Sequence, residues 1–363
     1  MAPLFSQIPT RPGRSPNLLT LLDPSQPIFY TTIFEHLNPV DTVNLLATCR
    51  QTRSLKKHVF NVNVLLRPFF KDPVQFRQVM ADNDLIVGGS MALRLFSRER
   101  WKSTDIDVYT ESHESVPAVA SFLEGEGYRF QPYFWQTNSL EETLSRRDRV
   151  KPQIENPFAF PATLPHGIGE VEGSFYGIEQ IKDIYAFVQE ETEKKIEVVL
   201  TRGSFLGLVL SYYATFLMNF FTYRTAFSLF PSGTFRDKKG FYVPPSSGLR
   251  SKTKRGVLKY ESRGYHLHTI WTSRWIREKH VRIRAIGDCD TWCLPLCTNG
   301  ISIPAREQKL QGARFSVVLK RGSWVEHLDN DSFYEWKNRD ILGKLPQSDH
   351  LKLKTGEFTE VFP

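Results

Sequence analysis

The segment LIVGGSMALRLFSRERWKSTDIDVYTE, from Leu85 to Glu111, restricts the fold of this chain more than any other stretch. An apolar run ends at two glycines and a serine, and a helix-length interval separates them from the sequence Asp-Ile-Asp. Glycines permit positive φ and close approach by a neighbouring group, so they favour a tight turn. The pattern predicts a strand, a turn, a helix and a second strand.

The glycine turn has a structural and a chemical interpretation. Ser90 follows Gly88 and Gly89 and is expected to cap a helix that begins at Met91 or Ala92. Free amide groups at the start of a helix bind anions, and a serine hydroxyl can add a contact to phosphate. Any tight connection between a strand and a helix could use the same residues without a ligand.

The two aspartates also have two interpretations. Asp105 and Asp107 are two residues apart in the expected strand, so their side chains share one face, roughly 6–7 Å apart along it. Ile106 and Val108 then point into the core. Neighbouring carboxylates repel each other, and a divalent cation relieves that repulsion. The aspartates therefore indicate either a metal site or a solvent-exposed strand edge.

The chain around this segment continues to alternate between helices and strands. Helices are expected at residues 74–80, 90–96 and 116–125, and strands at 84–87, 106–110, 128–133, 178–187 and 195–201. The proline-rich segment 151–169 is expected to be irregular. A hydrophobic content of 40%, with 27 phenylalanines, is sufficient for a large core. These features predict an α/β (α+β) fold with a mixed sheet.

Residues 203–223, GSFLGLVLSYYATFLMNFFTY, form an uncharged segment long enough to span a bilayer as a helix. Ser211, Thr215 and Asn219 are four residues apart and would make a polar stripe on such a helix. A buried helix with one polar face explains this stripe better than a membrane span. The N-terminus lacks a signal-peptide core, and four cysteines fit a reducing compartment. We therefore expect an intracellular protein, cytoplasmic or nuclear, without a membrane partner.

The order of a Gly-Gly-Ser turn, a helix and an Asp-x-Asp strand resembles the nucleotidyltransferase superfamily, whose fold is polymerase-beta-like. Gly89 and Ser90 match the turn of that family, and Asp105 and Asp107 match its first acid pair. The family carries a third acid on a later strand, and the resemblance assigns it to Glu197 in KKIEVVLT. A solvent-facing strand residue is the alternative for Glu197.

This resemblance implies transfer of a nucleotide from a nucleoside triphosphate to a hydroxyl acceptor, with Mg²⁺ as cofactor. Asp105, Asp107 and Glu197 would hold two Mg²⁺ ions. The triphosphate would be held by Gly88, Gly89 and Ser90. The sequence identifies neither the nucleotide nor the acceptor.

The N-terminal residues 21–62 are predicted to form packed short helices, with Asn38 as a cap, Pro39 at the first helical position and Asp41 in the first turn. The segment resembles an F-box, which implies docking onto the Skp-type adaptor of a cullin–RING ubiquitin ligase. The resemblance assigns that contact to Pro27, Ile28, Ile33, Phe34, Leu37, Pro39, Leu45 and Leu46. A helical bundle that only packs on the next domain is the alternative.

The chain thus divides into a flexible leader (1–20), the F-box-like unit (21–62), a nucleotidyltransferase-like domain with a basic C-terminal extension (63–345) and a tail (346–363). The formal net charge is +8, and the stretch from Arg250 to Arg284 contains eleven basic and two acidic residues. Such a run is either a solvated face or a contact for phosphate or nucleic acid. In the second case it could hold an anionic acceptor.

Two functions are consistent with these features, and the combination of motifs looks like a group of fungal proteins. The first function is the Mg²⁺-dependent nucleotidyltransferase fused to an F-box. The second is an F-box adaptor whose nucleotidyltransferase-like domain binds a target and is inactive. Convergence of three acids on the glycine turn distinguishes the two, because only the enzyme requires it.

Overall fold

The computed structural model describes residues 18–25, 27–101, 105–146, 180–241, 251–268, 283–305, 310, 313–319 and 323–328. The expected irregular segment 151–169 and the tail 346–363 lie outside these ranges, as does the leader up to residue 17. Residues 18–20, which we assigned to the leader, belong to the first helix.

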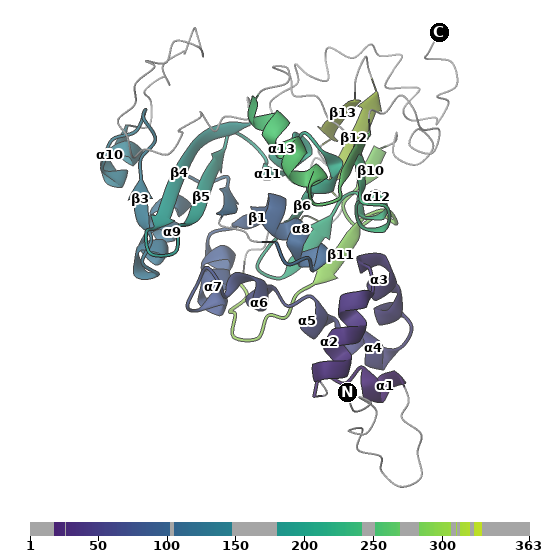
Figure 1. The fold of residues 1–363 in the computed structure, drawn as a ribbon. Coiled ribbons are helices and arrows are strands. Elements are labelled where there is room, and N and C mark those ends of the chain that lie inside the picture. Colours follow the sequence, from purple (N-terminus) through teal and green to yellow (C-terminus); the bar gives the residue numbers. More distant parts are fainter. Residues whose placement is uncertain are drawn as a thin grey trace, which may run out of the picture.

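Short helices build the N-terminal unit. They are α1 (Leu18–Leu21), α2 (Pro27–His36), α3 (Pro39–Ala47), α4 (Arg50–Ser54), α5 (Lys56–Val59) and α6 (Val62–Leu66). The predicted start of α3 is confirmed, because the Asn38 side chain accepts a hydrogen bond from the Asp41 amide at 2.9 Å. Helices α1–α5 extend from one end of the molecule, and α3 contacts α12 (Pro231–Arg236) (Figure 1).

The main domain contains a mixed sheet of eight strands, in the order β11-β7-β6-β1-β2-β5-β4-β3. The strands are β1 (Ile86–Gly88), β2 (Asp105–Thr110), β3 (Arg129–Gln131), β4 (Ile181–Gln189), β5 (Lys194–Thr201), β6 (Asn219–Phe221), β7 (Thr225–Ser228) and β11 (Trp292–Pro295). Strands β2 and β5 are parallel, and the other neighbouring pairs are antiparallel. The predicted α/β class with a mixed sheet is confirmed.

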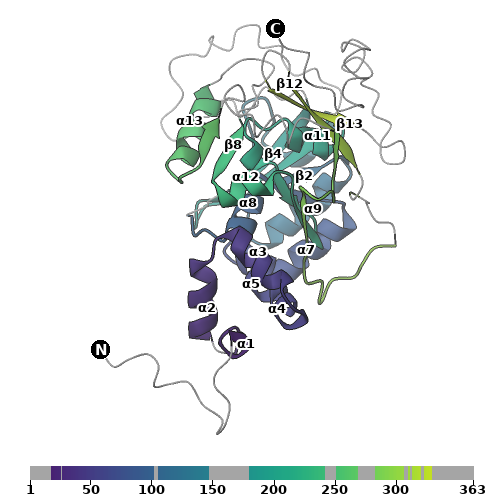
Figure 2. The same cartoon turned by 90° about the vertical axis from the view of Figure 1, so that its right-hand side faces the viewer.

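The two faces of the sheet belong to different hydrophobic cores. Helices α7 (Pro73–Asp82), α8 (Gly89–Ser97) and α9 (Ser115–Gly125) share one core with the N-terminal unit. Helix α11 (Phe205–Leu210) packs on the opposite face together with the small sheet of β10 (Ile283–Ala285), β12 (Arg314–Leu319) and β13 (Ser323–Leu328) (Figure 2). The remaining elements are α10 (Leu140–Ser145), η2 (Thr215–Leu217), β8 (Lys239–Phe241), α13 (Ser251–Glu261) and β9 (His266–His268).

The single helix expected at residues 203–223 does not form. Instead, α11 ends at Leu210, and the turn η2 and strand β6 follow. The residues of all three elements are buried, so an unbroken apolar run here reflects full burial rather than one helical face. Ser211 lies just past the end of α11, so the predicted polar stripe does not exist. In the described ranges, no helix has the length and hydropathy needed to cross a membrane.

Arg98 connects the N-terminal unit to the main domain through hydrogen bonds. It adopts a left-handed conformation at the end of α8, with φ of 58°. Its guanidinium donates hydrogen bonds to the carbonyls of Phe34 and Leu37, at the carboxyl end of α2, and to the Thr42 hydroxyl at 2.7 Å. A cation at the carboxyl end of a helix is favourable because it satisfies the last carbonyls and interacts with the helix dipole.

Replacing Arg98 by alanine is expected to loosen α2 and α3 without unfolding the sheet, because hydrogen bonds to a charged group contribute about 1.5–3 kcal/mol each. Hydrogen exchange should become at least about tenfold faster in these two helices. The matched control is Arg100→Ala, because Arg100 pairs with Glu35 through a side chain that is 83% exposed. Exposed pairs contribute little. Equal exchange in both variants would contradict the role of Arg98.

Candidate active site

The glycine turn joins β1 to α8, and its two positions require glycine for different physical reasons. A Cβ atom on Gly88 would lie 2.5 Å from Cε2 of Tyr109, so the Tyr109 ring occupies that space. Gly89 has φ of 60°, a conformation that other residues adopt only with strain. Ser90 is not the predicted cap, because α8 already begins at Gly89 and Gly88 is its N-cap. Ser90 instead lines the pocket together with Tyr260.

The aspartates follow the alternation predicted for β2. Ile106 and Val108 are fully buried, whereas Asp105 and Asp107 are half-buried on the opposite face. Asp107 lies against the turn, because its Oδ2 is 3.1 Å from the position that a Cβ on Gly89 would take. A side chain at Gly89 would therefore displace this carboxylate.

Glu197 lies beside Asp107 across the parallel pair β2–β5, where the two residues are partners in the register. Paired residues in neighbouring strands present their side chains on the same face. About ninety residues separate them in the sequence, and the described part of this interval forms α9, β3, α10 and β4. Glu197 accepts a hydrogen bond of 2.5 Å from the Tyr133 hydroxyl and forms an ion pair of 2.5 Å with Lys195.

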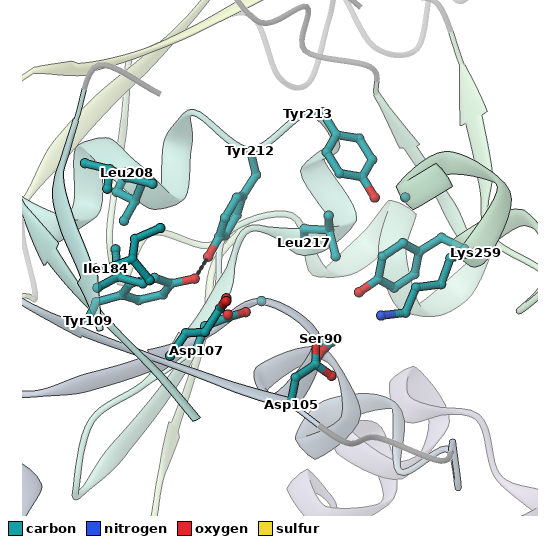
Figure 3. A pocket seen from close by; sticks show the side chains of 16 residues that line it. Ser90, Asp105, Asp107, Tyr109, Ile184, Leu208, Tyr212, Tyr213, Leu217 and Lys259 are labelled. Carbon is teal, nitrogen blue, oxygen red and sulfur yellow. Dashed lines mark hydrogen bonds between the residues drawn. The ribbon is translucent and has the colours of Figure 1, made fainter. Parts of the chain in front are cut away.

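These elements enclose a pocket of about 110 Å³. Its lining includes the predicted residues Gly89, Ser90, Asp105, Asp107 and Glu197. In Figure 3, Asp105 lies beside Ser90 and faces Lys259, whereas Asp107 lies nearer to Tyr109 and Tyr212. The structure therefore brings the three predicted acids, Gly89 and Ser90 to one cavity, whereas Gly88 does not line it.

Tyrosines form much of the remaining wall. The hydroxyls of Tyr109 and Tyr212 hydrogen-bond each other. Burial raises the pKa of Tyr212 well above its usual value, and the neighbouring Asp107 charge raises it further. Burial also raises the pKa of Tyr260. Because the neutral forms are favoured, both phenols remain protonated near neutral pH and can act as hydrogen-bond donors.

Sequence reasoning missed several of these lining residues. Tyr212 and Tyr213 lie in the segment that we interpreted as one long helix, and that interpretation gave no reason to expect their side chains in the pocket. Lys259 and Tyr260 come from α13, within the basic run. The excess of basic residues in this run is the sequence signal that could have indicated Lys259 as a phosphate contact. Residues 269–282 of the same run lie outside the described ranges.

The acids supply the oxygen ligands that Mg²⁺ prefers. Asp105 and Asp107 already share one face and one pocket. In the described ranges, however, no three His, Cys, Asp or Glu side chains are grouped closely enough to hold a metal ion. Glu197 is engaged by Lys195 and Tyr133, so its carboxylate would have to turn from Lys195 to join the aspartates. As these side chains lie, Asp105, Asp107 and Glu197 do not form a metal-binding group, and Mg²⁺ binding stays a prediction from their chemistry.

The residues assigned to adaptor binding have mixed environments. Phe34 is 4% exposed and Leu46 is fully buried, so both contribute to the hydrophobic core. The side chains of Ile33, Leu37, Pro39 and Leu45 are partly exposed. Pro27 and Ile28 belong to α2, and their side-chain environment lies outside what the structure describes. Any adaptor contact in this conformation would use the partly exposed residues rather than Phe34 or Leu46.

Comparison with known proteins gives no family model, no curated protein and no solved structure that matches this chain.

Proposed function

We propose that this chain is a Mg²⁺-dependent nucleotidyltransferase that uses the pocket at the β1–α8 turn. The observation that carries the proposal is the register of Asp107 with Glu197 on the parallel strands β2 and β5. Together with Asp105, these residues place three acids next to a glycine turn at the start of a helix. An inactive binding domain has no need for three acids in the wall of one pocket beside such a turn.

The residues of the pocket have distinct roles in the proposed reaction. Gly89 lies in the pocket wall at the start of α8, where backbone amides can donate hydrogen bonds to a phosphate, whereas Gly88 leaves room for the Tyr109 ring. Lys259 can neutralise phosphate charge from the opposite side of the pocket. Asp105, Asp107 and Glu197 would hold Mg²⁺. When bound, the metal would neutralise the phosphates and lower the pKa of the acceptor hydroxyl.

The size of the pocket limits what it encloses. A volume of about 110 Å³ is below the ~300–1,000 Å³ typical of pockets that bury a drug-sized ligand. We therefore place the reacting phosphate inside the pocket and the sugar and base at its open side. Lys259 belongs to the basic run, which supports an anionic acceptor approaching from α13.

Isothermal titration calorimetry tests the proposal. Purified protein is titrated with ATP, GTP, CTP and UTP, with and without Mg²⁺. We expect Mg²⁺-dependent binding of at least one nucleotide, weakened at least about tenfold in the double variant Asp105→Ala/Asp107→Ala because several kcal/mol of metal-mediated charge stabilisation is lost. The matched control is Glu190→Ala/Glu191→Ala, which removes two exposed acids from the β4–β5 turn. This control should bind normally.

Absence of binding by folded wild-type protein would contradict the proposed activity. The F-box adaptor would then be the leading function, and the pocket would have no catalytic role. The N-terminal helices α2 and α3, with the Asn38 cap, are the features that support this second candidate.

A further inference from the structure

A pair of arginines lies beyond the pocket, outside its lining. Arg94 is four residues after Ser90 on α8, and Arg263 is three residues after Tyr260, just past α13. Residues three or four apart lie on one side of a helix, one turn further along. Ser90 and Tyr260 line the same pocket, and the charges of the two arginines beyond them act on each other.

Aromatic rings hold Arg263 in place. Its guanidinium carbon lies 4.4 Å from the centre of the Trp101 ring and 5.2 Å from the centre of the Tyr260 ring. The planes of the two rings are 79° apart, so at most one ring stacks on a flat face of the guanidinium, and such cation–π contacts leave N–H groups available for hydrogen bonds. Arg263 is thus positioned to donate to a planar or tetrahedral oxyanion.

The described surroundings do not compensate the charges of this pair. Arg94 Nε and Arg263 Nη1 are buried and have no hydrogen-bond partner among the described residues. In the same ranges, neither side chain forms an ion pair with a carboxylate. Burial lowers the pKa of Arg94, and the charge of Arg263 lowers it further. Two like charges with unused donors are costly to bury, and a bound anion would relieve that cost.

We propose that Arg94 and Arg263 form an oxyanion site that binds a phosphate group. Two guanidinium groups match the charge of a phosphate monoester dianion, and each can donate two parallel hydrogen bonds to phosphate oxygens. Lys259, whose Nζ lies 6.0 Å from the centre of the Tyr260 ring, adds a third positive charge nearby. The site does not depend on the transfer reaction, because it uses none of the three acids.

The test uses inorganic phosphate as the probe, with chloride at equal ionic strength as the reference. Phosphate is expected to raise the melting temperature of the full chain, because it binds the folded state. In Arg94→Gln and Arg263→Gln, calorimetric affinity for phosphate should fall at least about tenfold. Arg129→Gln is the matched control, because Arg129 is an exposed arginine on the edge strand β3.

Stability without phosphate provides an independent readout. Arg94→Gln should melt at the same temperature as the wild type or higher, because one of two mutually repelling, partly buried charges is removed. Phosphate should reverse that order. The proposal is overturned if phosphate does not stabilise the wild type, if both Gln variants bind phosphate as the wild type does, or if Arg94→Gln is less stable without it.

The source of the phosphate is distinguished by competition. If Mg²⁺–ATP displaces inorganic phosphate, the site holds a phosphate of the nucleotide. If both bind together, it holds a phosphate on the acceptor. The Asp105→Ala/Asp107→Ala variant should still bind inorganic phosphate, so failure of the proposed activity would leave this result unchanged.

Discussion

Replacing Arg77 by methionine is expected to lower the free energy of unfolding by about 2–4 kcal/mol. Arg77 is 1% exposed and donates hydrogen bonds to the carbonyl of Tyr223, to the carbonyl of Cys297 at 2.7 Å, and to Oδ1 of Asn63 at 2.9 Å. Each buried acceptor left without a donor costs about 1–3 kcal/mol. Removal of a buried cation offsets part of that loss.

Arg77 has this effect because it joins three distant parts of the chain. Its partners lie in α6, in the β6–β7 turn and in the segment after β11. Burial lowers the pKa of Arg77 to about 10, so the guanidinium is still charged near neutral pH. Chemical denaturation measures the change. The matched control is Arg67→Met, which alters an exposed arginine and should have little effect.

The second large effect concerns Glu197 and Lys195, whose removal should change Mg²⁺ affinity in opposite directions. Glu197→Gln is expected to weaken Mg²⁺-dependent ATP binding at least about tenfold, because it removes a negatively charged metal ligand. Lys195→Met should strengthen it by up to about fivefold, because Lys195 and the metal compete for one carboxylate. Magnesium titrations at fixed ATP concentration measure both.

The control for this pair is Lys194→Met. Lys194 is the preceding residue in β5, and its side chain reaches the Pro68 carbonyl and the Phe69 ring instead of Glu197. The Lys194→Met variant removes a positive charge from the opposite face of the strand, so Mg²⁺ affinity should not change. Weaker Mg²⁺ binding in Lys195→Met would show that Lys195 supports the metal site rather than competing with the metal.

Local signals predicted two elements correctly, whereas the cap expected at Ser90 was wrong, because α8 begins at Gly89. The Asn38–Pro39 cap gave the start of α3, and the alternation of Asp105 to Val108 gave the faces of β2. Caps and alternation depend on neighbours within four residues, so the sequence displays them directly. The segment 203–223 has no such contrast between apolar and polar positions, and there the expected helix was wrong.

Other features depend on contacts between distant segments. Whether Phe34 points to a partner or to the core depends on where the N-terminal unit packs, and Arg98 holds it on the main domain. The involvement of Lys195 and Tyr133 with Glu197 likewise follows from the positions of β3, β4 and β5. The neighbouring residues in the sequence do not predict the partner of any of these residues.

The sequence by itself determined the glycine turn, the shared face of Asp105 and Asp107, and the mixed α/β class, because each follows from short-range periodicity and backbone sterics. The tertiary structure alone decided that Glu197 lies beside Asp107. That pairing requires a parallel contact across about ninety residues, and many registers would satisfy the same local pattern. Packing of the intervening elements selects one register, and it brings the three acids to one pocket.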